Sequence, residues 1–131
     1  MILVDSSVWI DFFRGVESPE ADRLHALLGS DELLVADLVI VEVLQGYGRD
    51  SEFNTALDLM SRMEAIVIGG ADVAVAAARN YRYLRSRGIT IRKTIDTLIA
   101  TRCIQDELTL LYSDRDFDPF VAHLGLVALT P

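Results

Sequence analysis

A short apolar run at the start of the chain ends abruptly at an acid. Ile2-Leu3-Val4 precedes Asp5, after which apolar residues recur at helical spacing. A second apolar run, residues 108–112, is followed after one serine by Asp114. If the two runs are neighbouring parallel strands, both carboxylates leave the sheet at the same edge, which is where ligands bind in open α/β sheets. The pattern therefore predicts an acidic crevice.

Two further acids lie in apolar surroundings, where a merely hydrated carboxylate would be unusual. Glu42 lies within the stretch 38–44 and Asp96 within the stretch 95–100. Carboxylates that share one crevice disfavour joint ionisation unless a cation joins them. Because no Cys or His accompanies these oxygen ligands, they favour Mg²⁺ or Mn²⁺ over zinc. The candidate catalytic and metal-binding residues are Asp5, Glu42, Asp96 and Asp114.

This set of acids suggests the hydrolysis of a phosphodiester, in which a metal polarises the phosphoryl oxygen and activates the attacking water. Asp5, Asp96 and Asp114 would hold the metal, and Glu42 would orient or deprotonate the water or complete a second metal site. A structural role competes with each assignment. Asp5 or Asp114 could cap a helix, and Glu42 or Asp96 could pair with an arginine.

Five further residues are candidates for supporting roles. Asp116 is a possible peripheral metal ligand, with a turn-forming role as the alternative. Ser7 and Ser113 could hydrogen-bond a ligand carboxylate or a metal-bound water, although capping explains Ser7 equally well. Arg92 and Lys93 could contact a phosphate backbone, with exposure to solvent or contact with a partner protein as the alternatives.

Short apolar runs alternate with helical patterns along the whole chain, which predicts an α/β fold with a mainly parallel sheet covered by helices on both faces. Strands are expected near residues 2–4, 33–36, 65–68, 108–112 and 126–129. Helices are expected at residues 6–13, 19–28, 38–45, 51–63, 71–87 and 95–103, with a short one after residue 113. Ser6 and Ser7 would cap the first helix and Asp37 the third.

The 131 residues, of which 51% are hydrophobic, suffice for a buried core and suit one domain over residues 1–131. No apolar run reaches the roughly 20 residues of a membrane-spanning helix, and the start lacks the basic segment of a secretory signal. The lone Cys103 can form no internal disulfide and occupies an apolar helical position, which predicts a core residue. We therefore expect a cytoplasmic protein without membrane contact.

The net charge of −8 argues against a surface that coats nucleic acid generally, because such surfaces are usually basic. The charge is unevenly distributed, however, since residues 79–93 contain half of the 12 Lys and Arg residues and no acid. This segment predicts either a positive strip beside the acidic crevice or an ordinary solvated helix face. Its basic residues are Arg79, Arg82, Arg85, Arg87, Arg92 and Lys93.

Four blocks of the sequence, in their order and spacing, resemble the PIN-domain ribonucleases, and in particular the VapC toxins of bacterial type II toxin–antitoxin systems. The blocks are ILVDSSVWIDFF (2–13), VIVEVLQG (39–46), TIRKTIDTLIA (90–100) and LYSDRDFDPF (111–120). The resemblance runs over essentially the whole chain. The acids of the family correspond to Asp5, Glu42, Asp96 and Asp114, and Asp116 matches an acid often seen there.

The resemblance implies a PIN-like fold and a Mg²⁺- or Mn²⁺-dependent endoribonuclease that cuts structured RNA, such as transfer or ribosomal RNA, and so inhibits translation. It also implies a homodimer and a cognate VapB antitoxin, whose C-terminal segment fills the groove and places a basic side chain by the acids. The family commonly has Thr where this chain has Ser6, and either residue supplies a hydroxyl.

Two other functions compete with a nuclease. A receiver-type phospho-acceptor domain would share the parallel sheet and the acidic Mg²⁺ pocket, but it needs a Lys after a late strand, whereas the only lysine, Lys93, precedes a helical pattern. A non-catalytic module that binds RNA or a partner protein would use the acids to hold a metal for stability only.

Overall fold

The computed structural model describes all 131 residues and contains one sheet of five parallel strands. The strands are β1 (Ile2–Val4), β2 (Leu33–Ala36), β3 (Glu64–Ile66), β4 (Thr109–Leu111) and β5 (Val127–Ala128). Their spatial order is β3-β2-β1-β4-β5, and Val4 of β1 lies opposite Leu111 of β4. The prediction of an α/β fold with a parallel sheet is confirmed.

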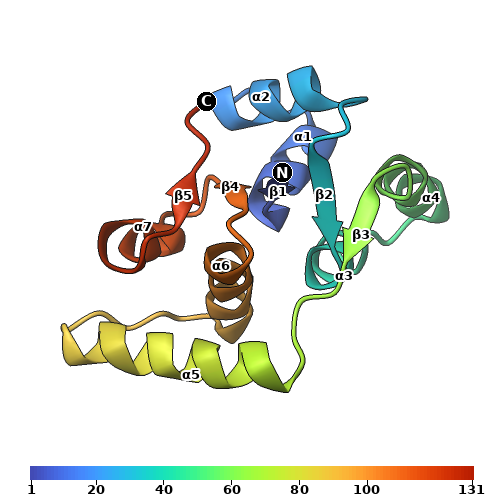
Figure 1. The fold of residues 1–131 in the computed structure, drawn as a ribbon. Coiled ribbons are helices and arrows are strands. Elements are labelled where there is room, and N and C mark those ends of the chain that lie inside the picture. Colours follow the sequence, from blue (N-terminus) through green and yellow to red (C-terminus); the bar gives the residue numbers. More distant parts are fainter.

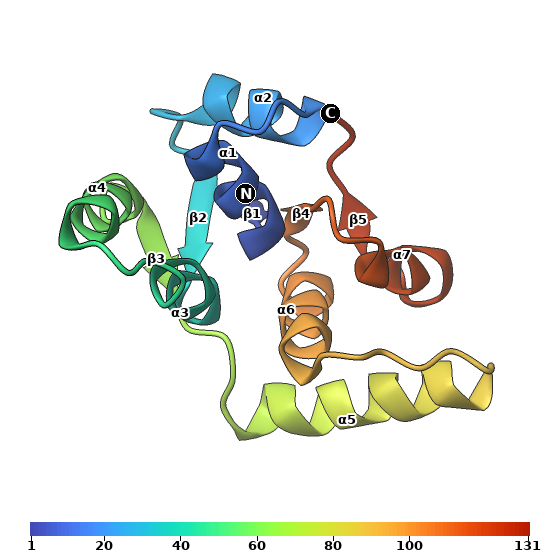
Figure 2. The same ribbon diagram turned by 180° about the vertical axis from the view of Figure 1, so that it is seen from behind.

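Seven α-helices connect and cover the strands (Figures 1 and 2). They are α1 (Ser6–Arg14), α2 (Pro19–Leu27), α3 (Asp37–Leu44), α4 (Asp50–Met60), α5 (Ala71–Ser86), α6 (Thr94–Gln105) and α7 (Asp118–Leu124), and a 3₁₀ turn, η1 (Arg115–Phe117), precedes α7. In Figure 1, α2 lies above the central strands, α1 overlaps β1, and α5 and α6 lie below them. None of the helices combines the length and the apolar character that crossing a membrane requires.

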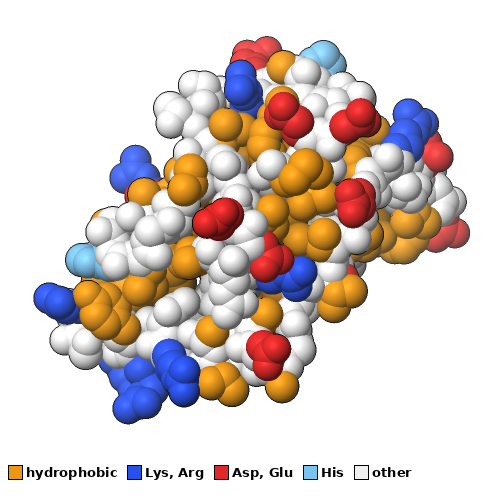
Figure 3. Space-filling view, in the orientation of Figure 1, with side chains coloured by type: hydrophobic (Ala, Val, Ile, Leu, Met, Phe, Trp, Pro, Cys, Tyr) orange, Lys and Arg blue, Asp and Glu red, His pale blue; other side chains and the backbone are white.

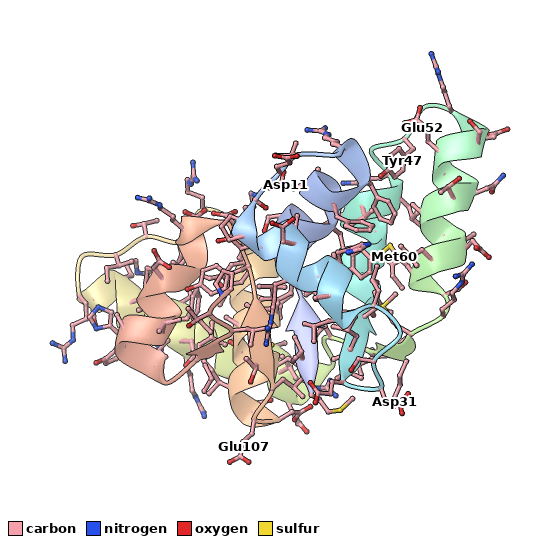
Figure 4. The ribbon with its side chains drawn as sticks, turned by 90° about the horizontal axis from the view of Figure 1, so that it is seen from above. Asp11, Asp31, Tyr47, Glu52, Met60 and Glu107 are labelled. Atoms are coloured by element: carbon pink, nitrogen blue, oxygen red, sulfur yellow. The ribbon has the colours of Figure 1, made fainter.

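The core lies between the sheet and these helices. The central strands β1 and β2 and most of β4 are buried, so they read as continuous apolar runs, as expected for a parallel sheet that is covered on both faces. Trp9 of α1 and Cys103 of α6 are both buried in this core, which confirms the predicted place of Cys103. Met60 points inward from α4 (Figure 4) and is also buried.

The order of the strands explains where a ligand would bind. From β1 the chain adds β2 and β3 on one side, and it then returns to add β4 and β5 on the other side. In open parallel sheets, the crevice at such a reversal, beyond the carboxyl ends of the strands, is the usual binding site. Asp31 and Glu107, which precede β2 and β4, both lie toward the opposite edge (Figure 4).

Several local predictions were wrong. Ser6 and Ser7 do not cap α1, because Asp5 is its N-cap, and Asp37 is the first residue of α3 rather than its cap. Instead, one carboxylate oxygen of Asp37 accepts hydrogen bonds from the amides of Leu38 and Ile68, which ties α3 to the segment after β3. Strands β3 and β5 are shorter than expected.

Candidate active site

The site begins at the carboxyl ends of β1 and β4. The amide of Asp5 donates to the carbonyl of Leu111 at 2.9 Å, so the pairing of the two strands continues to the residue that carries the carboxylate. Asp5 is 2% exposed. As the N-cap of α1, its Oδ2 accepts hydrogen bonds from the amide of Ser7 at 3.0 Å and from the Ser7 hydroxyl at 2.6 Å. Capping therefore occupies one carboxylate oxygen and leaves the other, Oδ1, free.

The hydroxyls of the first turn of α1 connect three parts of the site. The Ser7 hydroxyl donates to Asp5 and also accepts, at 3.3 Å, from the amide of Ser113 beyond β4. The Ser6 hydroxyl donates to Oε1 of Glu42 at 3.2 Å. The first turn of α1 thus positions the acid of β1, the loop after β4 and the acid of α3. This gives Ser7 a positioning contact within the protein, whereas Ser113 takes part through its backbone.

Three aspartates form the tightest acidic group. One carboxylate oxygen of each of Asp96, Asp114 and Asp116 lies within 4.8 Å of the corresponding oxygens of the other two. Asp96 lies in the first turn of α6 and is 3% exposed. Asp114 caps η1 by accepting from the amide of Asp116 at 3.0 Å, so the turn itself fixes the spacing of these two acids.

Asp5 and Glu42 are outside this tight group but act on it electrostatically. Burial, followed by the charge of Asp5, raises the pKa of Asp96 from 3.8 to about 7. Burial also raises the pKa of Asp5, where the charge of Asp114 adds to the effect and the hydrogen bonds of Ser7 oppose it. Burial and then the charge of Asp5 raise the pKa of Glu42, although its hydrogen bond from Ser6 opposes the rise. The predicted convergence of four distant acids is therefore present, and Asp116 joins them.

Two cations of the chain lie against this group. The ammonium of Lys93 lies 3.6 Å from Oδ2 of Asp114. The guanidinium of Arg92 donates to both carboxylate oxygens of Asp116, at distances of 3.1–3.3 Å. The charge of Asp96 raises the pKa of Lys93 most. Burial opposes this rise, and the charges of Asp114 and Glu42 add to it. These ion pairs were not predicted, because Glu42 and Asp96, rather than Asp114 and Asp116, were the expected partners of an arginine.

The rest of the basic segment lies on α5 and in the turn after it. Arg79, Arg82, Arg85 and Arg87 are exposed, and none of them forms an ion pair. In Figure 3, Lys and Arg side chains gather at the lower left, over the end of α5. These four arginines therefore form a solvated basic face, and of the basic segment only Arg92 and Lys93 contact the acids.

The residues present suit a hard divalent cation. Oδ1 of Asp5 and Oδ2 of Asp96 are buried and have no hydrogen-bond partner. A buried polar atom without a partner is costly, and for an ionised carboxylate the cost is especially high. The acidic group offers oxygen donors only, as Mg²⁺ and Mn²⁺ prefer.

A receiver-type arrangement is absent, since Lys93 precedes α6 rather than following a strand.

Comparison with known proteins identifies the family. The family model described as the PIN domain matches residues 2–120. The VapC ribonuclease Mb1587 of Mycobacterium bovis and the ribonuclease VapC11 of Mycobacterium tuberculosis are each 32% identical over 130 residues, which cover 98% of this chain and 97% of theirs. The structure of VapBC2 from Rickettsia felis, bound to a DNA fragment from its promoter, shares the fold with a TM-score of 0.77 and 19% identity over 98% of both chains. The chain therefore belongs to the PIN-domain family, within its VapC ribonucleases.

Proposed function

We propose that this chain is a toxin of the VapC type, an endoribonuclease that hydrolyses RNA phosphodiester bonds with a bound Mg²⁺ or Mn²⁺. The observation that carries the proposal is the convergence of five acids from four segments of the chain, two of which have a buried carboxylate oxygen without a partner. Such an arrangement destabilises a protein that has no use for it. The family membership of the chain and the ribonuclease names of its relatives support the same conclusion.

The metal would be held by the acids at the ends of β1 and β4 and at the start of α6, namely Asp5, Asp114 and Asp96, with Asp116 as a peripheral ligand. When bound, the metal polarises the phosphoryl oxygen and lowers the pKa of the attacking water. The unpartnered oxygens of Asp5 and Asp96 would be available without breaking any hydrogen bond.

Glu42 would orient the attacking water and take its proton. Its hydrogen bond from Ser6 fixes one carboxylate oxygen, and its raised pKa brings it nearer to the range of an effective general base at neutral pH. The water oxygen then forms a bond to phosphorus as the bond from phosphorus to the leaving ribose oxygen breaks. Arg92 and Lys93 would contact the RNA backbone. Ser7 would act by positioning Asp5 and the loop at Ser113.

The proposal extends to the partners and the setting of the protein. As one PIN domain over residues 1–131, it would cut structured RNA such as transfer or ribosomal RNA in the cytoplasm and so inhibit translation. A VapB-type antitoxin would neutralise it by filling the groove beside the acids. It would also form a homodimer, which would cover apolar surface such as Val41 of α3 and Val75 of α5, both more than half exposed.

The test is RNA cleavage by purified protein freed of antitoxin. Wild type should cut transfer or ribosomal RNA with Mg²⁺ or Mn²⁺, lose the activity in chelator and regain it when metal is restored. Asp96→Asn should be inactive under all of these conditions. Asp58→Asn is the matched control, because Asp58 is an exposed acid of α4 that pairs only with Arg62, just beyond the end of that helix, and it should cut as well as wild type.

Two results would contradict this proposal. Cleavage that survives both chelation and Asp96→Asn would refute a metal-dependent mechanism. A folded wild type that cuts none of the RNAs would favour the non-catalytic binding module.

A further inference from the structure

Arg92 and Lys93 both lie in the connector between α5 and α6, and both bind carboxylates that a metal would need. Lys93 contacts Asp114 and Arg92 contacts Asp116, and these acids are two of the three in the tight group. The third acid, Asp96, forms no ion pair and keeps an unpaired buried oxygen, although its charge acts on Lys93. The two side chains therefore neutralise the outer, accessible half of the acidic group.

These contacts can break without rearranging the fold. The side chains of Arg92 and Lys93 are 76% and 56% exposed, and neither residue belongs to a helix or a strand. Their carboxylate partners are less mobile, since Asp114 is held by the amide of Asp116 within η1. The cations are thus the movable members of each pair, and exposed ion pairs of this kind are weak.

A divalent cation among the three aspartates would change the balance of charge. It would lie close to the Lys93 ammonium and the Arg92 guanidinium, and like charges at such distances repel. The same two side chains would then be free beside a site at which a polyanion must bind. Arginine and lysine are the residues that commonly contact phosphates.

We propose that Arg92 and Lys93 are exchangeable counter-ions of this site, which occupy Asp114 and Asp116 in the metal-free protein and transfer to RNA phosphate when a divalent cation takes those carboxylates. The inference rests on the proposed metal-dependent nuclease function. Metal binding and RNA binding would strengthen each other. The metal frees Arg92 and Lys93 to bind RNA, and RNA draws these side chains away from the carboxylates that the metal needs. By linkage, the factor by which the metal strengthens RNA binding equals the factor by which RNA strengthens metal binding.

The first test measures Mn²⁺ affinity by electron paramagnetic resonance in the absence of RNA. Lys93→Gln should bind Mn²⁺ roughly tenfold more tightly than wild type, because one repelling charge is gone. Arg92→Gln/Lys93→Gln should bind more tightly still, and Lys93→Arg should stay near wild type. Arg115→Gln is the matched control: it removes one exposed cation next to Asp114 in sequence that forms no ion pair, so its affinity should change little.

The second test measures binding of labelled, unfractionated transfer RNA in a Glu42→Gln background, where cleavage is blocked. Mn²⁺ should strengthen RNA binding by Glu42→Gln protein severalfold relative to chelator. In protein that also carries Arg92→Gln/Lys93→Gln, this enhancement should be largely lost. The double variant would thus bind metal more tightly and RNA more weakly, a combination that general unfolding does not produce.

The outcomes separate the two proposals. If wild type shows no Mn²⁺ binding, or if its Mn²⁺ binding is the same in Asp96→Asn, the proposed metal-dependent function fails. If wild type binds such Mn²⁺ but Lys93→Gln leaves the affinity unchanged, weakens it, or changes it no more than Arg115→Gln does, the counter-ion proposal is overturned and the nuclease function stands. An enhancement of RNA binding by Mn²⁺ that persists in the double variant would also overturn it.

Discussion

Replacing Asp96 by Asn should stabilise the metal-free protein at neutral and alkaline pH. Asp96 is almost completely buried, lies near Asp5 and has one carboxylate oxygen without a partner. Its charged form is therefore destabilising in the fold unless a metal is bound. Asn has nearly the same shape and remains neutral at every pH, so the substitution removes the charge without leaving a cavity.

The magnitude follows from the shift in pKa. The pKa of Asp96 in the fold is about 7, against an ordinary value of 3.8. One pKa unit corresponds to about 1.4 kcal/mol, so the gap of roughly three units amounts to at most about 4 kcal/mol. Because Asp96 titrates together with its acidic neighbours, we expect a gain of roughly 2–4 kcal/mol in the free energy of unfolding.

The sign of the pH dependence is also determined. A raised pKa in the folded state means that the unfolded state releases its proton first as the pH rises, so Asp96 lowers stability progressively between pH 3.8 and about 7. Asn cannot titrate. The stability difference between Asp96→Asn and wild type should therefore be small near pH 4, grow through this interval and reach a plateau above it.

The assay is urea unfolding in chelator at several pH values from 4.5 to 8.5. Asp58→Asn should change stability by less than about 1 kcal/mol, because its partner is an exposed Arg62. Saturating Mn²⁺ should reverse the order, since it stabilises only a protein that binds it. The reasoning is refuted if Asp96→Asn is no more stable than wild type at pH 8, or if its advantage is as large at pH 4.5.

Two other substitutions test the local structure of the site. Ser7→Ala removes the hydroxyl that joins Asp5 to the loop at Ser113, so it should lower the free energy of unfolding by about 1–2 kcal/mol and reduce RNA cleavage. The effect of Lys93→Gln on Mn²⁺ affinity should be the same in Ser7→Ala protein as in wild type. Unchanged stability and cleavage would contradict the positioning role of Ser7. Asp37→Ala removes the acceptor of the Leu38 and Ile68 amides, so it should cost about 1–3 kcal/mol in urea unfolding, while Asp37→Asn, which keeps an acceptor oxygen, should cost less; equal losses would show that the carboxylate charge, rather than the hydrogen bonds, is what matters.

The order of the elements and the convergence of the acids could be predicted from sequence for a simple physical reason. Strands of a covered parallel sheet must be apolar on both faces, so runs such as 2–4 and 33–36 stand out, and the carboxyl ends of parallel strands share one edge. An acid directly after such a run, as at Asp5, has its place in the fold set by the strand itself.

Contacts that depend on the path of a loop could not be predicted in this way. The pairing of Lys93 with Asp114 and of Arg92 with Asp116 depends on how the connector to α6 passes the turn after β4, and no local pattern encodes that path. The predicted helix caps were wrong for a related reason. A serine and an aspartate are both good caps, and contacts with distant segments, those of Asp5 with Leu111 and of Asp37 with Ile68, decided between the candidates.

The most direct test of the central claim is the position of Mn²⁺ in crystals of wild-type protein, located by its anomalous scattering. The account predicts a peak that is bound by carboxylate oxygens of Asp96 and Asp114 and that lies within coordinating distance of Asp5 or Asp116, and it predicts no such peak in Asp96→Asn. Mn²⁺ bound only elsewhere, with Lys93 still on Asp114, would contradict it.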